Sequence, residues 1–130
     1  MEIAIIGQSA FGKSVLEALV NKGEDEIVGV FAPPTREGRP VDPITEAAAE
    51  LDIPVFEFKR LRDPEAIDRF TSDEPELCVM AFVSDIVPMD MIDCPPLGTI
   101  QYHPSMLPLH RGPSSINWPI INGETETGLT

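Results

Sequence analysis

The stretch that decides the fold is Ile3-Ala4-Ile5-Ile6-Gly7, together with the segment 10–21 that follows it. The first five residues are a short, β-branched apolar run that ends in glycine, which is typical of a buried strand. In the second segment, apolar side chains recur at helical spacing: these are Phe11, Val15, Leu16, Leu19 and Val20. Lys22-Gly23 then supplies a basic last turn and a glycine stop. A buried strand that turns directly into a helix predicts the first half of a βαβ unit.

The same alternation of strand and helix continues along the chain. Apolar runs predict further strands, and capping signals predict the helices between them. The expected strands are 27–32, 55–58, 77–83 and 98–103, with the start of another at 127–130. The expected helices are 43–51 and 64–71, each led by an Asp-Pro pair, then 87–92 and 114–121. This order predicts an α/β fold: a Rossmann-like, doubly wound, mostly parallel sheet with right-handed crossovers.

Ligands of such sheets bind beyond the carboxyl ends of the strands. We therefore expect a site near the residues that end the predicted strands. These residues are Gly7, Ala32, Val83 and His103.

The bulk composition excludes several classes of function. A chain of 130 residues is about one domain, and its net charge of −13 disfavours a nucleic-acid partner. Cys78 and Cys94 are too few for a disulfide framework and lack zinc-ligand spacing. The first residues lack the basic region of a signal peptide, and no apolar run approaches the ~20 residues of a membrane helix. We expect a cytoplasmic protein without a membrane partner.

Residues 7–14 have two possible interpretations, a nucleotide-binding loop or a tight strand-to-helix turn. Residues 7–14, Gly-Gln-Ser-Ala-Phe-Gly-Lys-Ser, satisfy the G-x-x-x-x-G-K-S pattern of a phosphate-binding loop and stand between a strand and a helix. Against this, Phe11 is bulky, and Asp85 is poorly placed as a magnesium ligand. We therefore favour the alternative, in which Gly7 and Gly12 permit a tight strand-to-helix turn and Lys13 is solvated.

Polar residues interrupt the strand predicted at 98–103. Thr99, Gln101 and His103 alternate along it and so share one face. A strand in the middle of a parallel sheet is usually apolar on both faces, and exceptions mark functional sites. His103 is therefore either a core histidine bonded to backbone groups or a proton-transferring imidazole beside an amide that can polarise a carbonyl. His110, in a proline-bounded loop, is expected to be solvated.

Several stretches of the chain carry a resemblance to a known family. They are similar to motifs of the formyltransferase family. The strongest match is Tyr102-His103-Pro104-Ser105-Met106-Leu107-Pro108, followed by Arg111-Gly112 and Ile116-Asn117-Trp118. The other matching stretches are Ile5 to Gly12, Val28-Gly29-Val30-Phe31 and Phe82 to Met89. The chain most resembles the N-terminal hydrolase domain of 10-formyltetrahydrofolate dehydrogenases. The resemblance runs the length of the chain, and Tyr-His-Pro-Ser favours this branch over methionyl-tRNA formyltransferases.

The resemblance implies a function and a set of site residues. It implies that 10-formyltetrahydrofolate is the formyl donor and that water or an amine is the acceptor. His103 matches the family's catalytic acid/base, and Gln101 matches an amide that polarises the formyl carbonyl. The segment matching the family's folate contacts contains Phe82, Asp85, Ile86 and Val87. The alternative is a folate-binding module without catalysis.

The chain departs from the family pattern at two places. Gln101 stands where many members have Asn, which moves the amide by roughly an angstrom and weakens an oxyanion contact. The family's essential Asp lies beyond the strand that begins at 127–130, so residues 1–130 are expected to be a single N-terminal folate-binding domain, incomplete after Thr130. The missing carboxylate would come from a further C-terminal segment or domain, or from another chain of an oligomer.

Overall fold

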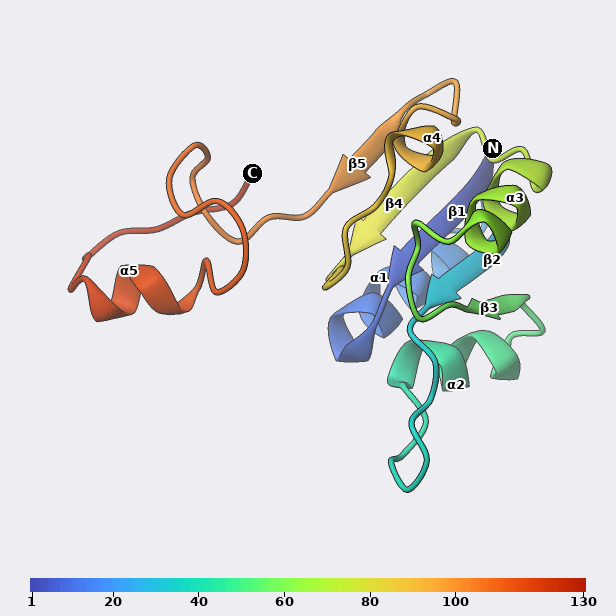
Figure 1. Ribbon diagram of the computed structural model, residues 1–130, viewed down its shortest axis with the longest axis horizontal. Coiled ribbons are helices and arrows are strands. Elements are labelled where there is room, and N and C mark those ends of the chain that lie inside the picture. The colour runs from blue at the N-terminus through green and yellow to red at the C-terminus, as the bar shows by residue number, and fades with distance from the viewer. The chain divides into compact units, whose positions relative to one another are not determined.

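The computed structural model describes all 130 residues, which form two compact units. Residues 1–100 form an α/β unit, and residues 101–130 form a loop-rich unit with one short helix, α5 (Asn117–Ile121). Figure 1 shows the order of the elements within each unit. None of the helices has the length and apolarity that crossing a bilayer requires.

A five-stranded parallel sheet is the centre of the first unit, as the sequence predicts. Its strands are β1 (Glu2–Gly7), β2 (Glu26–Ala32), β3 (Val55–Glu57), β4 (Leu77–Ala81) and β5 (Thr99–Gln101). They lie in the order β3-β2-β1-β4-β5, and their arrows point the same way in Figure 1. The chain builds outward from β1 to β3 and then returns to the other side of β1, so a topological switch point lies between β1 and β4. Such a point is where this class of sheet binds ligands.

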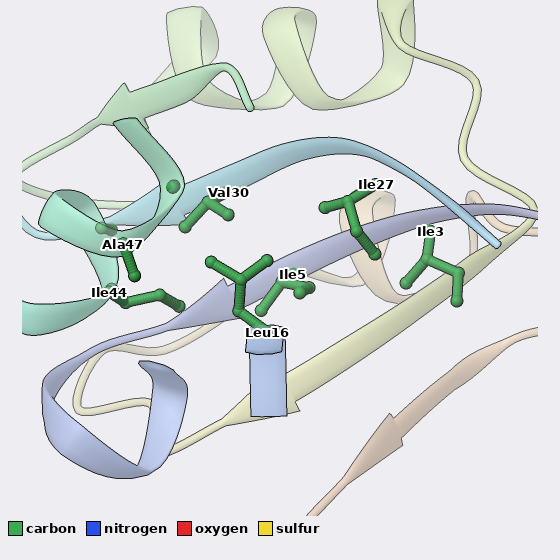
Figure 2. Packing of buried hydrophobic residues seen from close by; sticks show 9 residues of the cluster. Ile3, Ile5, Leu16, Ile27, Val30, Ile44 and Ala47 are labelled. Atoms are coloured by element: carbon green, nitrogen blue, oxygen red, sulfur yellow. The ribbon is translucent and has the colours of Figure 1, made fainter. Parts of the chain in front are cut away.

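Helices cover both faces of the sheet, which confirms the doubly wound architecture. One face packs against α1 (Ser9–Lys22) and α2 (Pro43–Glu50); its fully buried centre includes Ile5, Leu16 and Ile44 (Figure 2). The other face packs against α3 (Pro64–Ser72) and α4 (Met89–Ile92) through Phe70 and Met91. Strands buried on both faces explain the continuous apolar runs in the sequence.

The two predicted Asp-Pro helix starts differ in the structure. The Asp42 side chain caps α2 by accepting a hydrogen bond from Ile44 N, 3.1 Å away. Asp63 makes no such bond to α3; its carboxylate instead lies 3.2 Å from Nε of Arg60. The expectation of a side-chain cap at Asp63 is therefore wrong, because an ion pair with the preceding turn takes the carboxylate.

Two strands end earlier than the apolar pattern predicts. β4 stops at Ala81 rather than Val83, because Phe82 adopts a left-handed backbone with φ 61°. β5 covers only 99–101 and lies at the edge of the sheet rather than in its middle. The segment 127–130 is not a regular strand, and the helix expected over 114–121 is reduced to α5.

Candidate functional site

A cavity of about 370 Å³ lies in the first unit, beyond the carboxyl ends of β1, β2 and β4. This is the edge at which the strand order predicts a ligand site. Its walls combine aromatic and aliphatic side chains with a few polar groups, the usual composition of a small-molecule site. The lining includes Phe31, Phe58, Phe82, Gln8, Ser84 and Asp85.

The loop after β4 carries two of the predicted folate-contact residues into this cavity. Phe82 and Asp85 line it, whereas Ile86 is 73% exposed and Val87 packs against the core on the α3/α4 face. Phe82 is a bulky residue with a positive φ and is 54% exposed. Backbone strain of this kind costs on the order of 1–3 kcal/mol and clusters at ligand sites.

Asp85 holds the loop after β4 to the neighbouring loop. Its Oδ2 accepts a hydrogen bond from Leu61 N at 2.7 Å, and its Oδ1 accepts one from Ile86 N at 2.8 Å. Both carboxylate oxygens are therefore engaged with the backbone. Asp85 shapes the cavity wall, and its carboxylate is already satisfied before any ligand arrives.

The sequence interpretation missed the cationic part of the cavity. Arg36 and Lys59 both line it, although the chain has only nine Lys and Arg residues in all. Arg36 lies in the polar loop after β2, and Lys59 follows β3. Two basic residues in an otherwise acidic chain favour an anionic or electron-rich group in the ligand. Their positions beyond adjacent strand ends were the available signal.

The phosphate-loop pattern at 7–14 has a structural explanation. Ser9 N, which would face a phosphate, donates instead to Asp42 Oδ1 at 2.7 Å. A Cβ at Gly7 would lie 2.7 Å from the Ala81 carbonyl oxygen, so this glycine serves the close packing of β1 on β4. Lys13 is partly exposed and lies 3.7 Å from Glu17. An internal carboxylate already fills the anion position, so the loop does not cradle phosphate.

In the second unit, the loop that carries His103 is fastened by Thr130. The backbones of His103 and Thr130 exchange two hydrogen bonds, of 2.9 and 3.0 Å. The Thr130 hydroxyl donates to Ser105 O at 2.8 Å and accepts from Leu107 N at 3.0 Å. The fully buried Ser105 donates its own hydroxyl to Leu109 O at 2.7 Å. These bonds hold the loop 103–109 in one shape.

The His103 ring is half-buried, and one of its nitrogens has a partner. Nε2 lies 3.1 Å from the carbonyl oxygen of His110. A carbonyl oxygen only accepts, so Nε2 carries the proton, and Nδ1 holds the lone pair of the neutral ring. Gln101, two residues earlier, is exposed.

His110 is not solvated as the sequence suggested. Its side chain is only 16% exposed, and its Nε2 lies 2.9 Å from Glu124 Oε1. Asn122 donates a further bond of 3.3 Å to the same carboxylate oxygen. The hydrogen bond from His110 and then that from Asn122 lower the pKa of Glu124. The prediction of a solvated His110 is wrong because Glu124, 14 positions along the chain, folds back and pairs with its ring.

Comparisons with known proteins identify the family of this chain. The family model described as formyl transferase matches residues 1–130. The chain belongs to the formyltransferase family. A cytosolic 10-formyltetrahydrofolate dehydrogenase of Xenopus tropicalis is 44% identical over all of this chain, which spans 15% of that relative. A methionyl-tRNA formyltransferase of Roseiflexus sp. (strain RS-1) is 38% identical, and the chain spans 42% of it.

Solved formyltransferase structures share the fold. The phosphoribosylglycinamide formyltransferase of Bacillus halodurans superposes with a TM-score of 0.81 at 18% identity, over all of this chain and 70% of the other. At that identity the likeness establishes the Rossmann-like formyltransferase fold alone. The chain spans about one-seventh of the curated dehydrogenases that it matches.

Proposed function

We propose that this chain supplies the formyl-donor site and the acid/base histidine of an enzyme that transfers the formyl group of 10-formyltetrahydrofolate to water or an amine. The observation that carries the proposal is the His103 ring, which is half-buried and has its Nε2 proton donated to the His110 carbonyl. Its Nδ1 is thereby left with a lone pair that can take a proton. Family membership and the dehydrogenase relatives support the choice of donor.

The cavity in the first unit is the proposed binding site for the folate. Its volume, about 370 Å³, and its aromatic walls suit a flat ring that is polar only at its edges. We propose that Phe82 contacts the ring and that the backbone of Asp85, Ile86 and Val87 meets the ring edges. The Asp85 side chain keeps that backbone in place.

In the hydrolytic version of the reaction, the histidine moves one proton in each direction. His103 takes a proton from water as the water oxygen bonds to the formyl carbon, which becomes tetrahedral. The carbon–nitrogen bond to the folate then breaks, and the same proton passes to the departing nitrogen. Formic acid and tetrahydrofolate are released, and the second proton of the water goes to solvent as formic acid ionises to formate, so atoms and charge balance. Gln101 is proposed to donate its amide N–H to the developing oxyanion.

Two further features complete the proposal. We propose that the carboxylate that assists His103 is supplied by residues beyond Thr130 or by another chain, and that residues 1–130 act as one folate-binding domain. We also propose a cytoplasmic location, which the cytosolic dehydrogenases among the relatives support. The chain's charge of −13 argues against a tRNA acceptor.

Formate release from 10-formyltetrahydrofolate by the full-length protein tests the catalytic assignment. His103→Ala is expected to reduce the rate at least 100-fold, because general acid/base groups contribute roughly 10²–10⁴-fold. Gln101→Ala is expected to cost less, because the side chain is exposed. An unchanged rate in His103→Ala would remove His103 from the mechanism.

The competing function is a folate-binding module without catalysis. The cavity residues are present in this chain, whereas no described carboxylate contacts His103. A chain with the binding cavity but without an assisting carboxylate favours this alternative. Calorimetric titration of the full-length protein with tetrahydrofolate, beside the formate assay, separates the two. Binding without turnover supports the module, and turnover excludes it.

A further inference from the structure

We propose that His110 and Glu124 form a positioning pair that fixes the proton of His103 on Nε2. The inference rests on the proposed function, because it assigns a role toward the acid/base histidine. It concerns residues of the second unit only, and the pair acts through the backbone carbonyl of His110. His110 is therefore a positioning residue rather than a catalytic one.

The backbone of His110 is held in a conformation that side chains rarely adopt. Its φ is 51°, in the left-handed region. Such a conformation persists only where the surroundings impose it, and it clusters at functional sites. Here it coincides with a carbonyl oxygen that accepts a hydrogen bond from the His103 ring at 3.1 Å.

The side chain of His110 is held by the carboxylate of Glu124. Its Nε2 donates to the Glu124 carboxylate, with distances of 2.9 and 3.1 Å to the two oxygens. Asn122 adds a hydrogen bond to Glu124, and the pKa of Glu124 is lowered by the bonds from His110 and Asn122. Backbone strain and side-chain pairing at the same residue have one common consequence, which is a fixed carbonyl opposite the His103 ring.

A fixed carbonyl decides which tautomer the neutral His103 ring adopts. Only a ring protonated on Nε2 can donate to it, so Nδ1 is the nitrogen available for proton transfer. Without this contact, the ring could rotate and exchange tautomers, and a fraction of molecules would present the wrong nitrogen. Orienting partners of catalytic histidines act in this way in other enzymes.

The direct test is the tautomer itself, read from ¹⁵N chemical shifts of the imidazole nitrogens in full-length protein labelled at histidine. We expect neutral His103 to be protonated on Nε2. A neutral ring protonated mainly on Nδ1 would overturn the proposal. This measurement does not depend on turnover, so it stays informative even if His103→Ala retains activity and the proposed function fails.

A matched pair of variants separates the backbone from the ring of His110. His110→Asn and His110→Val both remove the imidazole, but asparagine tolerates a positive φ whereas β-branched valine does not. We expect His110→Val to lower kcat about tenfold to a hundredfold, as small misplacements of catalytic groups do. His110→Asn is expected to retain more activity and more of the Nε2 tautomer. Equal behaviour of the two variants would contradict a role for the carbonyl.

A second variant tests the carboxylate. Glu124→Ala is expected to lower kcat and to mix the His103 tautomers, with the KM for 10-formyltetrahydrofolate changed less than about twofold, because ground-state binding is untouched. Glu126→Ala is the control, because Glu126 is an exposed carboxylate in the same segment. If the control lowers kcat as much as Glu124→Ala does, the pairing is not the cause.

Discussion

Asp85 offers a sharp test of how the cavity is built. Its two carboxylate oxygens accept hydrogen bonds from Leu61 N at 2.7 Å and Ile86 N at 2.8 Å. The change Asp85→Asn keeps the size of the side chain but leaves one oxygen acceptor instead of two. The amide NH₂ group then faces a backbone donor, so one of the two bonds is lost.

The free-energy cost of Asp85→Asn follows from the loss of one of these two hydrogen bonds. A hydrogen bond to a charged group contributes about 1.5–3 kcal/mol, and the side chain is only partly exposed, so we expect the local opening free energy to fall by about that amount. This corresponds to a decrease of about tenfold to a hundredfold in the protection of a backbone amide against hydrogen exchange. Because the loop after β4 forms part of the cavity wall, the proposed folate binding should weaken, which raises the KM for 10-formyltetrahydrofolate more than it lowers kcat.

Hydrogen exchange read at the amides of Leu61 and Ile86 is the suitable assay, because it reports locally in a protein of any length. Asp90→Asn, which neutralises an exposed carboxylate on α4, is the control. If protection at both amides is the same in Asp85→Asn as in the control, the carboxylate does not hold the loops together. The explanation of the cavity wall would then be refuted.

Three further predictions concern packing and charge. Burial raises the pKa of the Cys78 thiol to about 12, so iodoacetamide at pH 8 should leave Cys78 unmodified until the protein unfolds, and the folded state should lose stability as the pH rises above about 9. Gly7→Ala should lower the free energy of unfolding by about 1–3 kcal/mol in urea titrations, because its Cβ would lie 2.7 Å from the Ala81 carbonyl oxygen. The pKa of Glu124 is lower in the folded state, so the charged carboxylate stabilises the folded state above its unfolded pKa. This stabilisation is lost as the pH falls through the folded pKa, so the stability difference between the native protein and Glu124→Gln should begin to shrink once the pH falls below about 4.5.

Much of the fold was predictable from local pattern. The run at 3–7, the helical spacing at 10–21 and the Asp42-Pro43 start each depend on residues close together in the chain, and β1, α1 and α2 follow them within one or two residues. Strand ends were predicted less well. Apolar side chains continue through Phe82 and Val83, but the strand ends where the Phe82 backbone turns left-handed.

Some residues of the candidate site could likewise be predicted from the sequence, and others could not. His103 stood out because a polar residue broke an apolar strand pattern, and Phe82 and Asp85 were named from the family motif. Arg36 and Lys59 were missed because they belong to separate loops whose only shared property is their position beyond neighbouring strand ends.

By itself, the sequence determined the order of strands and helices, the parallel sheet and the family, because periodicity and motifs are local properties of the chain. Only the tertiary structure decided how the polar side chains are used. Asp42 bonds to Ser9 across 33 residues, Asp85 to Leu61 across 24, and Glu124 to His110 across 14. Hydrogen bonds form wherever folding brings a donor to an acceptor, and no spacing in the sequence specifies such partners. The tight bonding of these side chains ruled out a phosphate loop and exposed the His110–Glu124 pair.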